Sequence, residues 1–323
     1  MGKLKENLSK KIPDWRYSYR QLLDEKGDHV TSTVTVDKAY SGMKGVKGMI
    51  CDTSSVTAEK GLHVRGRHIL DLVDLKPEEI LYLLLIGDLP SKDDLIDLQK
   101  ELKDKSQVPQ YVWDVLSSMP KDSHPMAMFN TAILSMQKES QFAEAYDLVI
   151  SKGDYWETTL EDGLNIIAKL PAIGAAIYRM RFDKGDRLNA GDSIDWSENF
   201  LQMMGFDYSD DMLKMMQLYL MLHCDHEGGN VSTFSALTVN SALSDPYYSL
   251  SAGLNGLAGP LHGLANQNNL KFVLDIIENY KGVPSDDELK KFSWDRLNSG
   301  KVIPGYGHAV LRCPDPRFTA FMD

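Results

Sequence analysis

The sequence contains little cysteine and no long apolar run. Its three cysteines, Cys51, Cys224 and Cys313, are scattered without CxxC spacing, which argues against a disulfide framework or a zinc ribbon. A reducing compartment is therefore the simpler interpretation. The longest apolar run, Ile80 to Ile86, is far too short to cross a bilayer. We therefore expect no membrane partner and no membrane span.

Positive charge is also scarce. The 323 residues include 35 Lys and Arg against 46 Asp and Glu, a formal net charge of −11, and no basic patch is apparent. Phosphate repulsion then argues against nucleic acid as a partner. Small anionic substrates are not excluded, because a few local arginines suffice to bind them. A length of 323 residues with 43% hydrophobic content predicts a sizeable core and division into two domains.

The N-terminus lacks the marks of a targeting segment. MGKLKENLSKK is rich in lysine, but it carries Glu6 and has no apolar stretch, so it resembles neither a secretory signal nor a good transit peptide. We expect a cytoplasmic, bacterial protein. The alternative is a mitochondrial matrix protein whose presequence is absent.

Helix signals dominate what is present. Short β-type runs at 30–36, 48–52 and 62–65 predict a small sheet near the N-terminus, and Trp15–Lys26 predicts a first helix closed by a left-handed Gly27. Capping residues and apolar periodicity predict further helices, which begin at Pro77, Ser91, Pro125, Tyr155, Ser209 and Ser285. Small residues at 172–176 predict a close helix–helix contact. The pattern predicts a mostly α protein.

The stretch from His223 to Gln267 concentrates the residue types that carry chemistry. It holds three of the eight histidines, and four glycines recur between leucines at helical spacing in 250–264. Each glycine costs a helix roughly 1 kcal/mol against alanine. Close packing of backbones, or the approach of a ligand, must offset that loss.

A metal site is the first alternative for this stretch. His223, Asp225, His226 and Glu227 crowd together, yet the order H-x-x-H-E matches neither H-E-x-x-H nor H-x-x-E-H. We therefore expect no metal here, and we place His223 in the core or behind the site. Taken alone, His262 reads equally well as a packed histidine at a tight turn.

Several blocks in this chain match one family in order and with compatible spacing. HCDHEGGNVS, SALSDPY, NGLAGPLHGLANQ and NSGKVIPGYGHAVLRCPDPR resemble the corresponding blocks of citrate synthases, particularly the mitochondrial type. VDKAYSGMKGVKGM, YWE and IAKLPAI extend the resemblance over nearly the whole chain. Several long motifs in sequence order are far more specific than one short pattern.

The resemblance implies a citrate-synthase-like, two-domain helical fold with minor β structure near the N-terminus. The large helical domain would span residues 1–263. Residues 264–323 would be the first part of a small domain, with the active site in the cleft between the two. The small residues at 172–176 would lie at the contact of a homodimer.

The resemblance also implies the reaction, a Claisen-type condensation of acetyl-CoA with oxaloacetate at the entry of the tricarboxylic acid cycle. No permanently bound cofactor is implied, because acetyl-CoA is a co-substrate. Such chemistry needs a base for the thioester methyl and a donor to the enolate oxygen. His262 matches the donor. We expect it in the first turn of a helix opened by Pro260, where the helix dipole keeps the ring neutral.

The remaining sites follow from the same resemblance. His308 matches the histidine that polarises the oxaloacetate carbonyl, although its glycine-rich loop alone reads as a surface turn. His226 and Arg317 match residues that bind oxaloacetate. Coenzyme A would contact Lys44 and the loop formed by Pro304, Gly305, Tyr306 and Gly307.

The chain departs from the family pattern at several points. Lys44 stands where many relatives carry arginine, and Asn268-Asn269 and Cys313-Pro314 replace the usual pairs. The family's base aspartate lies beyond Asp323, so we expect an incomplete polypeptide whose residues 1–323 alone do not turn over. Two alternatives stay open: a 2-methylcitrate synthase that uses propionyl-CoA, and a truncated, non-catalytic helical protein.

Overall fold

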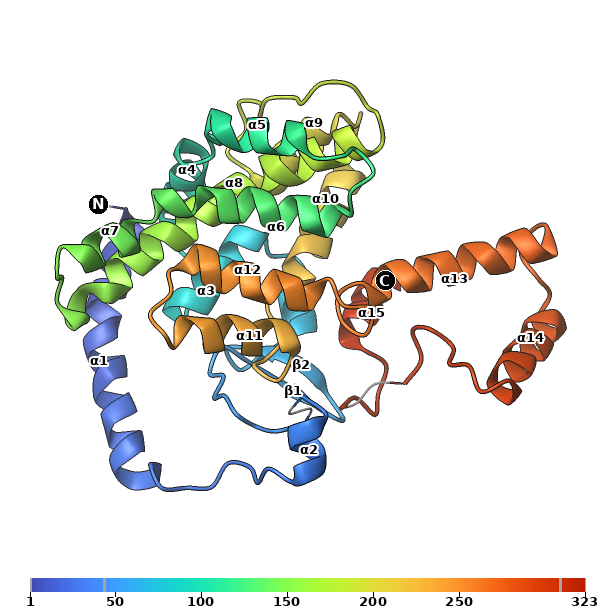
Figure 1. The fold of residues 1–323 in the computed structure, drawn as a ribbon, viewed down its shortest axis with the longest axis horizontal. Helices are drawn as coiled ribbons and strands as arrows, with labels where there is room; N and C mark the ends of the chain where they lie inside the picture. Colours follow the sequence, from blue (N-terminus) through green and yellow to red (C-terminus); the bar gives the residue numbers. More distant parts are fainter. Residues whose placement is uncertain (1, 43–44, 308–309, 323) are drawn as a thin grey trace.

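The computed structural model describes residues 2–42, 45–307 and 310–322, so Lys44 and His308 lie outside the described residues. The described chain is mostly α-helical, with one small antiparallel sheet near the N-terminus (Figure 1). The expected fold class is confirmed. No helix among the described residues is long and apolar enough to cross a membrane.

The elements follow in chain order. The α-helices are α1 (Lys3–Lys26), α2 (Val36–Tyr40), α3 (Pro77–Ile86), α4 (Lys92–Asp104), α5 (Gln110–Ser118), α6 (Pro125–Ser135), α7 (Gln141–Asp147), α8 (Tyr155–Arg181), α9 (Trp196–Met204), α10 (Asp210–Leu222), α11 (Val231–Asn240), α12 (Pro246–Leu257), α13 (Ala265–Tyr280), α14 (Asp286–Asn298) and α15 (Pro316–Met322). Short 3-10 turns lie at Ile69–Leu72, Met136–Glu139 and Lys152–Asp154. The strands are β1 (Ser54–Thr57), β2 (Gly61–Val64) and β3 (Arg67–His68).

Capping signals located the helix ends well. Pro77 opens α3, and Gly87 closes it in the left-handed conformation with φ 86°, as its lack of a Cβ allows. The hydroxyl of Ser91 accepts from the backbone N–H of Asp94 in a capping box at α4, and Ser285 does the same for Glu288 at α14. Local hydrogen bonds at these positions decide where the helix starts.

Other local expectations are wrong. Helix α1 begins at Lys3 rather than Trp15, since Leu4 and Leu8 are buried in the core and anchor its first turns. Gly27 at its end has φ −55°, a right-handed conformation. Residues 30–36 and 48–52 form no strand; the β-branched run at 30–36 is mostly exposed and has no partner strand to pair with. The strand expected at 62–65 is confirmed as β2.

The core is built around α8, which packs against α4, α6, α7, α9 and α12. Its side chains Ile166, Ile173 and Ile177 are buried with residues of α5, α6 and α12 in one cluster. Part of the small-residue run at 172–176, which was expected at a dimer contact, packs within the chain. A Cβ on Gly174 would lie 3.5 Å from Phe200 of α9, and Ala175 is 1% exposed. Ala175 is therefore a core position, and its replacement would not report on association.

The glycines in α12 have a physical explanation in the neighbouring helix. A Cβ added to Gly253 would lie 3.1 Å from the carbonyl oxygen of Ser232 in α11, and one on Gly256 would lie 3.4 Å from Val231. The two helices therefore run backbone to backbone (Figure 1). This contact offsets the helix-forming cost of glycine, as the sequence required.

The C-terminal part leaves the helical body. Helices α13 and α14 project away from it as an arm, and the chain then returns to α15 beside the body (Figure 1). Ile276 is the one buried residue of α13, and α14 has none among its described residues. The turn between α12 and α13 is thus the point at which body and arm meet.

Candidate active site

His262 lies in the turn between α12 and α13. Its backbone N–H donates to the carbonyl of Gly259 at 3.0 Å, and its own carbonyl accepts from Ala265 N at 3.0 Å. Helix α13 begins only at Ala265, so the expectation that His262 occupies the first turn of a helix is wrong. The ring is half-buried, and burial rather than a helix dipole lowers its pKa. A lowered pKa leaves the imidazole neutral near pH 7.

Ser232 of α11 holds the His262 ring. The Ser232 Oγ lies 2.8 Å from Nε2 of His262. When the hydroxyl donates to Nε2, the ring proton sits on Nδ1. A neutral imidazole in that tautomer presents one N–H donor to a bound molecule. The backbone contact between α11 and α12 therefore also sets the orientation of a candidate catalytic group.

His226 precedes α11 in a loop that is tied down from two sides. The side chain of Asn230 caps α11 by accepting from Thr233 N at 3.0 Å, and its Nδ2 donates back to the carbonyl oxygens of Glu227 at 2.9 Å and His226 at 3.3 Å. The N–H of Glu227 donates to Ser54 Oγ of β1 at 2.6 Å. The loop is thus fixed between the sheet and α11.

Arg317 lies at the start of α15 and pairs with Asp315. Its Nε donates to Oδ1 at 3.1 Å and its Nη2 donates to Oδ2 at 2.7 Å. Burial opposes ionisation of Asp315, but the Arg317 hydrogen bonds and the charge of His226 together hold its pKa below the ordinary value. Asp315 therefore holds the Arg317 guanidinium in place.

The β1–β2 hairpin supports the Arg317 segment as well as the His226 loop. Arg312 N donates to the carbonyl of Ala58 at 2.8 Å. Pro316 packs so closely on Gly61 that a Cβ there would lie 2.5 Å from Pro316 Cδ. The small sheet, which carries no candidate residue itself, therefore brings together two segments about ninety positions apart in the sequence.

The glycine-rich loop of Pro304, Gly305, Tyr306 and Gly307 lies against the first turns of α13. Gly305 and Gly307 have φ 84° and 85°, a conformation that favours glycine, and a Cβ on Gly305 would lie 3.3 Å from Asn269 Oδ1. Tyr306 is 82% exposed. The exposed loop is placed close to the turn that carries His262. The expected roles of Lys44 and His308 lie outside the described residues.

His223 does not occupy the position expected for it. Its side chain is exposed, with Nδ1 2.6 Å from the carbonyl of Tyr219 and the ring 4.4 Å from the Tyr219 ring. Over the described parts of the chain, no three His, Cys, Asp or Glu side chains gather as metal ligands.

Two positioning residues were not identified from the sequence. Ser232 and Asp315 each hold a candidate side chain, and neither stands out by residue type or spacing. The DPR triplet offered a signal for Asp315, since an acid two residues before an arginine at a helix start can cap and pair at once. Ser232 could not be found this way, because its contact depends on packing between two helices.

We compared the chain with protein-family models, with individual proteins and with solved structures, and all three comparisons point to the same family. A family model described as "Citrate synthase, C-terminal domain" matches residues 42–323. The mitochondrial citrate synthase of Saccharomyces cerevisiae is 42% identical over 327 residues, covering 98% of this chain and 68% of that protein. A mitochondrial 2-methylcitrate synthase of Yarrowia lipolytica is 40% identical over 328 residues, covering 98% and 70%.

A solved structure is also similar. A Thermoplasma acidophilum citrate synthase, in a ternary complex with carboxymethyl coenzyme A and oxaloacetate, superposes with a TM-score of 0.74 at 26% identity, covering 90% of this chain and 72% of that one. The curated relatives are named for mitochondria and for peroxisomes, so the comparisons do not place this chain in one compartment.

Proposed function

The chain belongs to the citrate synthase family, and on that premise we propose that it joins the methyl carbon of acetyl-CoA to the carbonyl carbon of oxaloacetate, after which water hydrolyses the thioester to give citrate and free CoA. This would be the entry step of the tricarboxylic acid cycle. The observation that carries the proposal is the Ser232–His262 pair. It supplies a neutral, oriented N–H donor of the kind that stabilises a thioester enolate.

Each candidate residue takes one role in this proposal. His262 donates to the enolate oxygen, while His308 polarises the oxaloacetate carbonyl that the enolate attacks. His226 and Arg317 bind the oxaloacetate. We assign the base that removes the methyl proton to no residue of 1–323, because no motif in the chain points to one of its carboxylates in that role.

Arg317 can bind a substrate while it stays paired. Its side-chain hydrogen bonds with the described residues use Nε and Nη2 toward Asp315, so Nη1 keeps its N–H donors for a carboxylate. Asp315 then acts by orienting the guanidinium. Oxaloacetate can occupy this subsite before the coenzyme binds.

Acetyl-CoA would enter as a co-substrate against the exposed loop of Pro304, Gly305, Tyr306 and Gly307, with Lys44 at a phosphate. We further propose that residues 1–263 form a large domain and that residues from 264 onward belong to a small one. The projecting arm of α13 and α14 supports that division (Figure 1). Closure of the two domains would exclude water from the enolate.

A 2-methylcitrate synthase is the second candidate, favoured by the Yarrowia relative. Propionyl-CoA differs from acetyl-CoA by one methylene, which changes transition-state binding by roughly 1–3 kcal/mol. With purified full-length protein and oxaloacetate, thiol release should therefore show a kcat/KM for acetyl-CoA roughly 10–200-fold above that for propionyl-CoA. A higher value for propionyl-CoA would reassign the substrate. Thiol release that does not require oxaloacetate would remove the condensation altogether.

We also propose a homodimer, supported by α11. Its sequence, VSTFSALTVN, is apolar, yet none of its residues is buried in the single chain, and Val231 and Leu237 are 49% and 40% exposed. A second subunit packed on α11 would cover them. We expect Leu237→Glu to convert the dimer to a monomer in sedimentation velocity, while Leu148→Glu, at an equally apolar but separate exposed site, leaves it dimeric. A wild-type monomer would contradict the proposal.

A further inference from the structure

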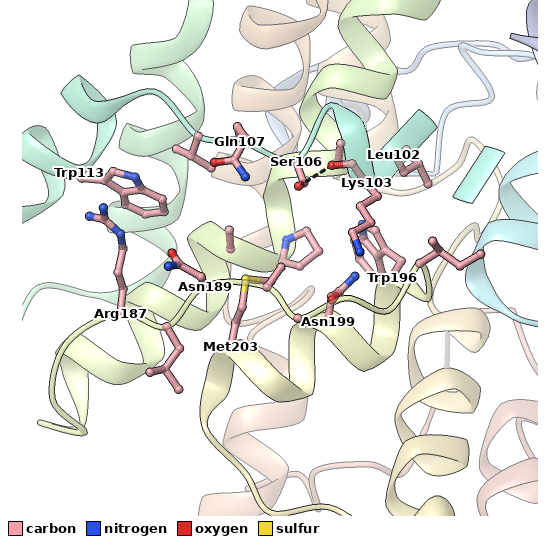
Figure 2. Close-up of a pocket in the computed structure, with 18 of the residues that line it drawn as sticks. Leu102, Lys103, Ser106, Gln107, Trp113, Arg187, Asn189, Trp196, Asn199 and Met203 are labelled. Atoms are coloured by element: carbon pink, nitrogen blue, oxygen red, sulfur yellow. Dashed lines mark hydrogen bonds between the residues drawn. The ribbon is translucent and has the colours of Figure 1, made fainter. Parts of the chain in front are cut away.

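A cavity of about 390 Å³ lies away from His262, between the α4–α5 connection, α8, α9 and the loop of residues 187–195 (Figure 2). Among the described residues, none that is assigned above to substrate or coenzyme lines it. Its volume falls within the range of small-molecule sites, roughly 300–1,000 Å³. The floor is apolar and comes from α8 and α9, including Pro171, Ala172 and Met203.

The charge of this cavity is opposite to that of the chain. The described residues that line it include two cations, Lys103 and Arg187, and no carboxylate, although the chain carries a net charge of −11. The Arg187 guanidinium stacks 4.8 Å from the ring centre of Trp113, while Lys103 lies across the cavity from them (Figure 2). Lys103 Nζ donates to the carbonyl of Asp192 and keeps further N–H donors.

Asn199 provides an acceptor that nothing in the described chain satisfies. The residue is 8% exposed, and its Nδ2 donates to the carbonyl of Ser193 at 2.9 Å. Its Oδ1 is buried without a hydrogen-bond partner, on the same side of the cavity as Lys103 (Figure 2). A buried unsatisfied acceptor costs roughly 1–3 kcal/mol. A ligand hydroxyl or amine in the cavity would remove that cost.

We propose that this cavity is a second binding site, for a small anionic metabolite. Its head group is a carboxylate or a phosphate held by Lys103, and it carries a hydroxyl or amino group that donates to Asn199 Oδ1. Arg187 and Trp113 close the opposite wall. The proposal does not rest on the condensation reaction, because the two sites share none of the residues that the structure describes.

The test is isothermal titration of the full-length protein with two probes that carry the shared chemistry, sn-glycerol 3-phosphate and glycerate. Oxaloacetate is present at saturation to fill the reaction site. We expect saturable binding of one of them, and the tighter probe identifies the head group. Uncharged glycerol should not bind. Absence of saturable binding by both probes overturns the proposal.

Matched variants locate the binding. Lys103→Gln should weaken the tighter probe at least about tenfold, the loss of one charge-assisted hydrogen bond of about 1.4 kcal/mol. Lys100→Gln removes the same charge from an exposed position of the same helix and should leave binding unchanged. Neither variant should alter oxaloacetate-dependent thiol release. Equal binding by Lys103→Gln and the wild type would overturn the site.

The contribution of Asn199 is tested by changing the ligand and leaving the protein unchanged. The test therefore does not require a variant of this buried residue to fold. Ethyl phosphate and propionate keep the anion and lack the hydroxyl. The analogue that matches the tighter probe's head group should bind about tenfold more weakly than that probe. Equal affinities would show that no donor reaches Asn199 and would overturn that part of the proposal.

Discussion

Replacing His262 with alanine is expected to lower kcat on the order of 10²–10³-fold, the usual loss when one oxyanion donor is removed. The substitution takes away the N–H that Ser232 orients, and methyl-proton abstraction then yields an unstabilised enolate. The measurement is thiol release from acetyl-CoA with saturating oxaloacetate. The KM for oxaloacetate should change little, because His226 and Arg317 remain.

His29→Ala is the matched control, since that histidine is exposed and lies in the segment before α2. It should leave kcat unchanged. The wild-type pH profile adds a second readout. Burial lowers the pKa of His262, so the neutral ring, whose Nε2 accepts from Ser232, should persist below the ordinary histidine range and be lost only as the pH falls through the lowered pKa. A kcat for His262→Ala within a few-fold of wild type would remove His262 from the mechanism.

Replacing Asp162 with alanine is expected to lower the free energy of unfolding by about 3 kcal/mol. The Asp162 carboxylate is fully buried in α8 and accepts from Ser140 Oγ at 2.7 Å and from the N–H groups of Gln141 at 2.7 Å and Phe142 at 3.3 Å. It thereby caps α7. Alanine leaves these three donors without their acceptor, and urea unfolding measures the loss.

Two variants test whether the cap is the cause. Asp162→Asn keeps a carbonyl acceptor in the same place and should lose less than alanine does. Asp147→Ala, at the exposed end of α7, should lie within about 0.5 kcal/mol of wild type. Equal stability of Asp162→Ala and the wild type would show that the buried hydrogen bonds contribute no net stability.

The fold could be predicted wherever local hydrogen bonds decide the outcome. Pro77 with Gly87, Ser91 with Asp94, and Ser285 with Glu288 each mark a helix end by chemistry contained within a few residues. Residues 30–36 failed because a β-branched run becomes a strand only when another strand lies beside it. The sequence predicted too short a helix α1, because Leu4 and Leu8 are buried only by their packing against α3 and α4.

The candidate site could likewise be predicted from the sequence only in part. Motif resemblance placed His262, His226 and Arg317, and the structure connects them through α11, the β1–β2 hairpin and the 311–317 segment. The helix-dipole argument for His262 failed because Pro260 begins a turn rather than a helix. Ser232 and Asp315 lay beyond sequence reasoning, since the partner of each side chain depends on how separate segments pack.

The central claim is that this chain serves a carbon–carbon bond-forming reaction rather than binding alone. The most direct measurement follows acetyl-CoA labelled with ¹³C at the methyl carbon, incubated with oxaloacetate and the full-length protein, by NMR. The account predicts that the label appears in a methylene of citrate, with one free CoA thiol per citrate. Label that remains in acetyl-CoA, or that is released as acetate, would contradict it.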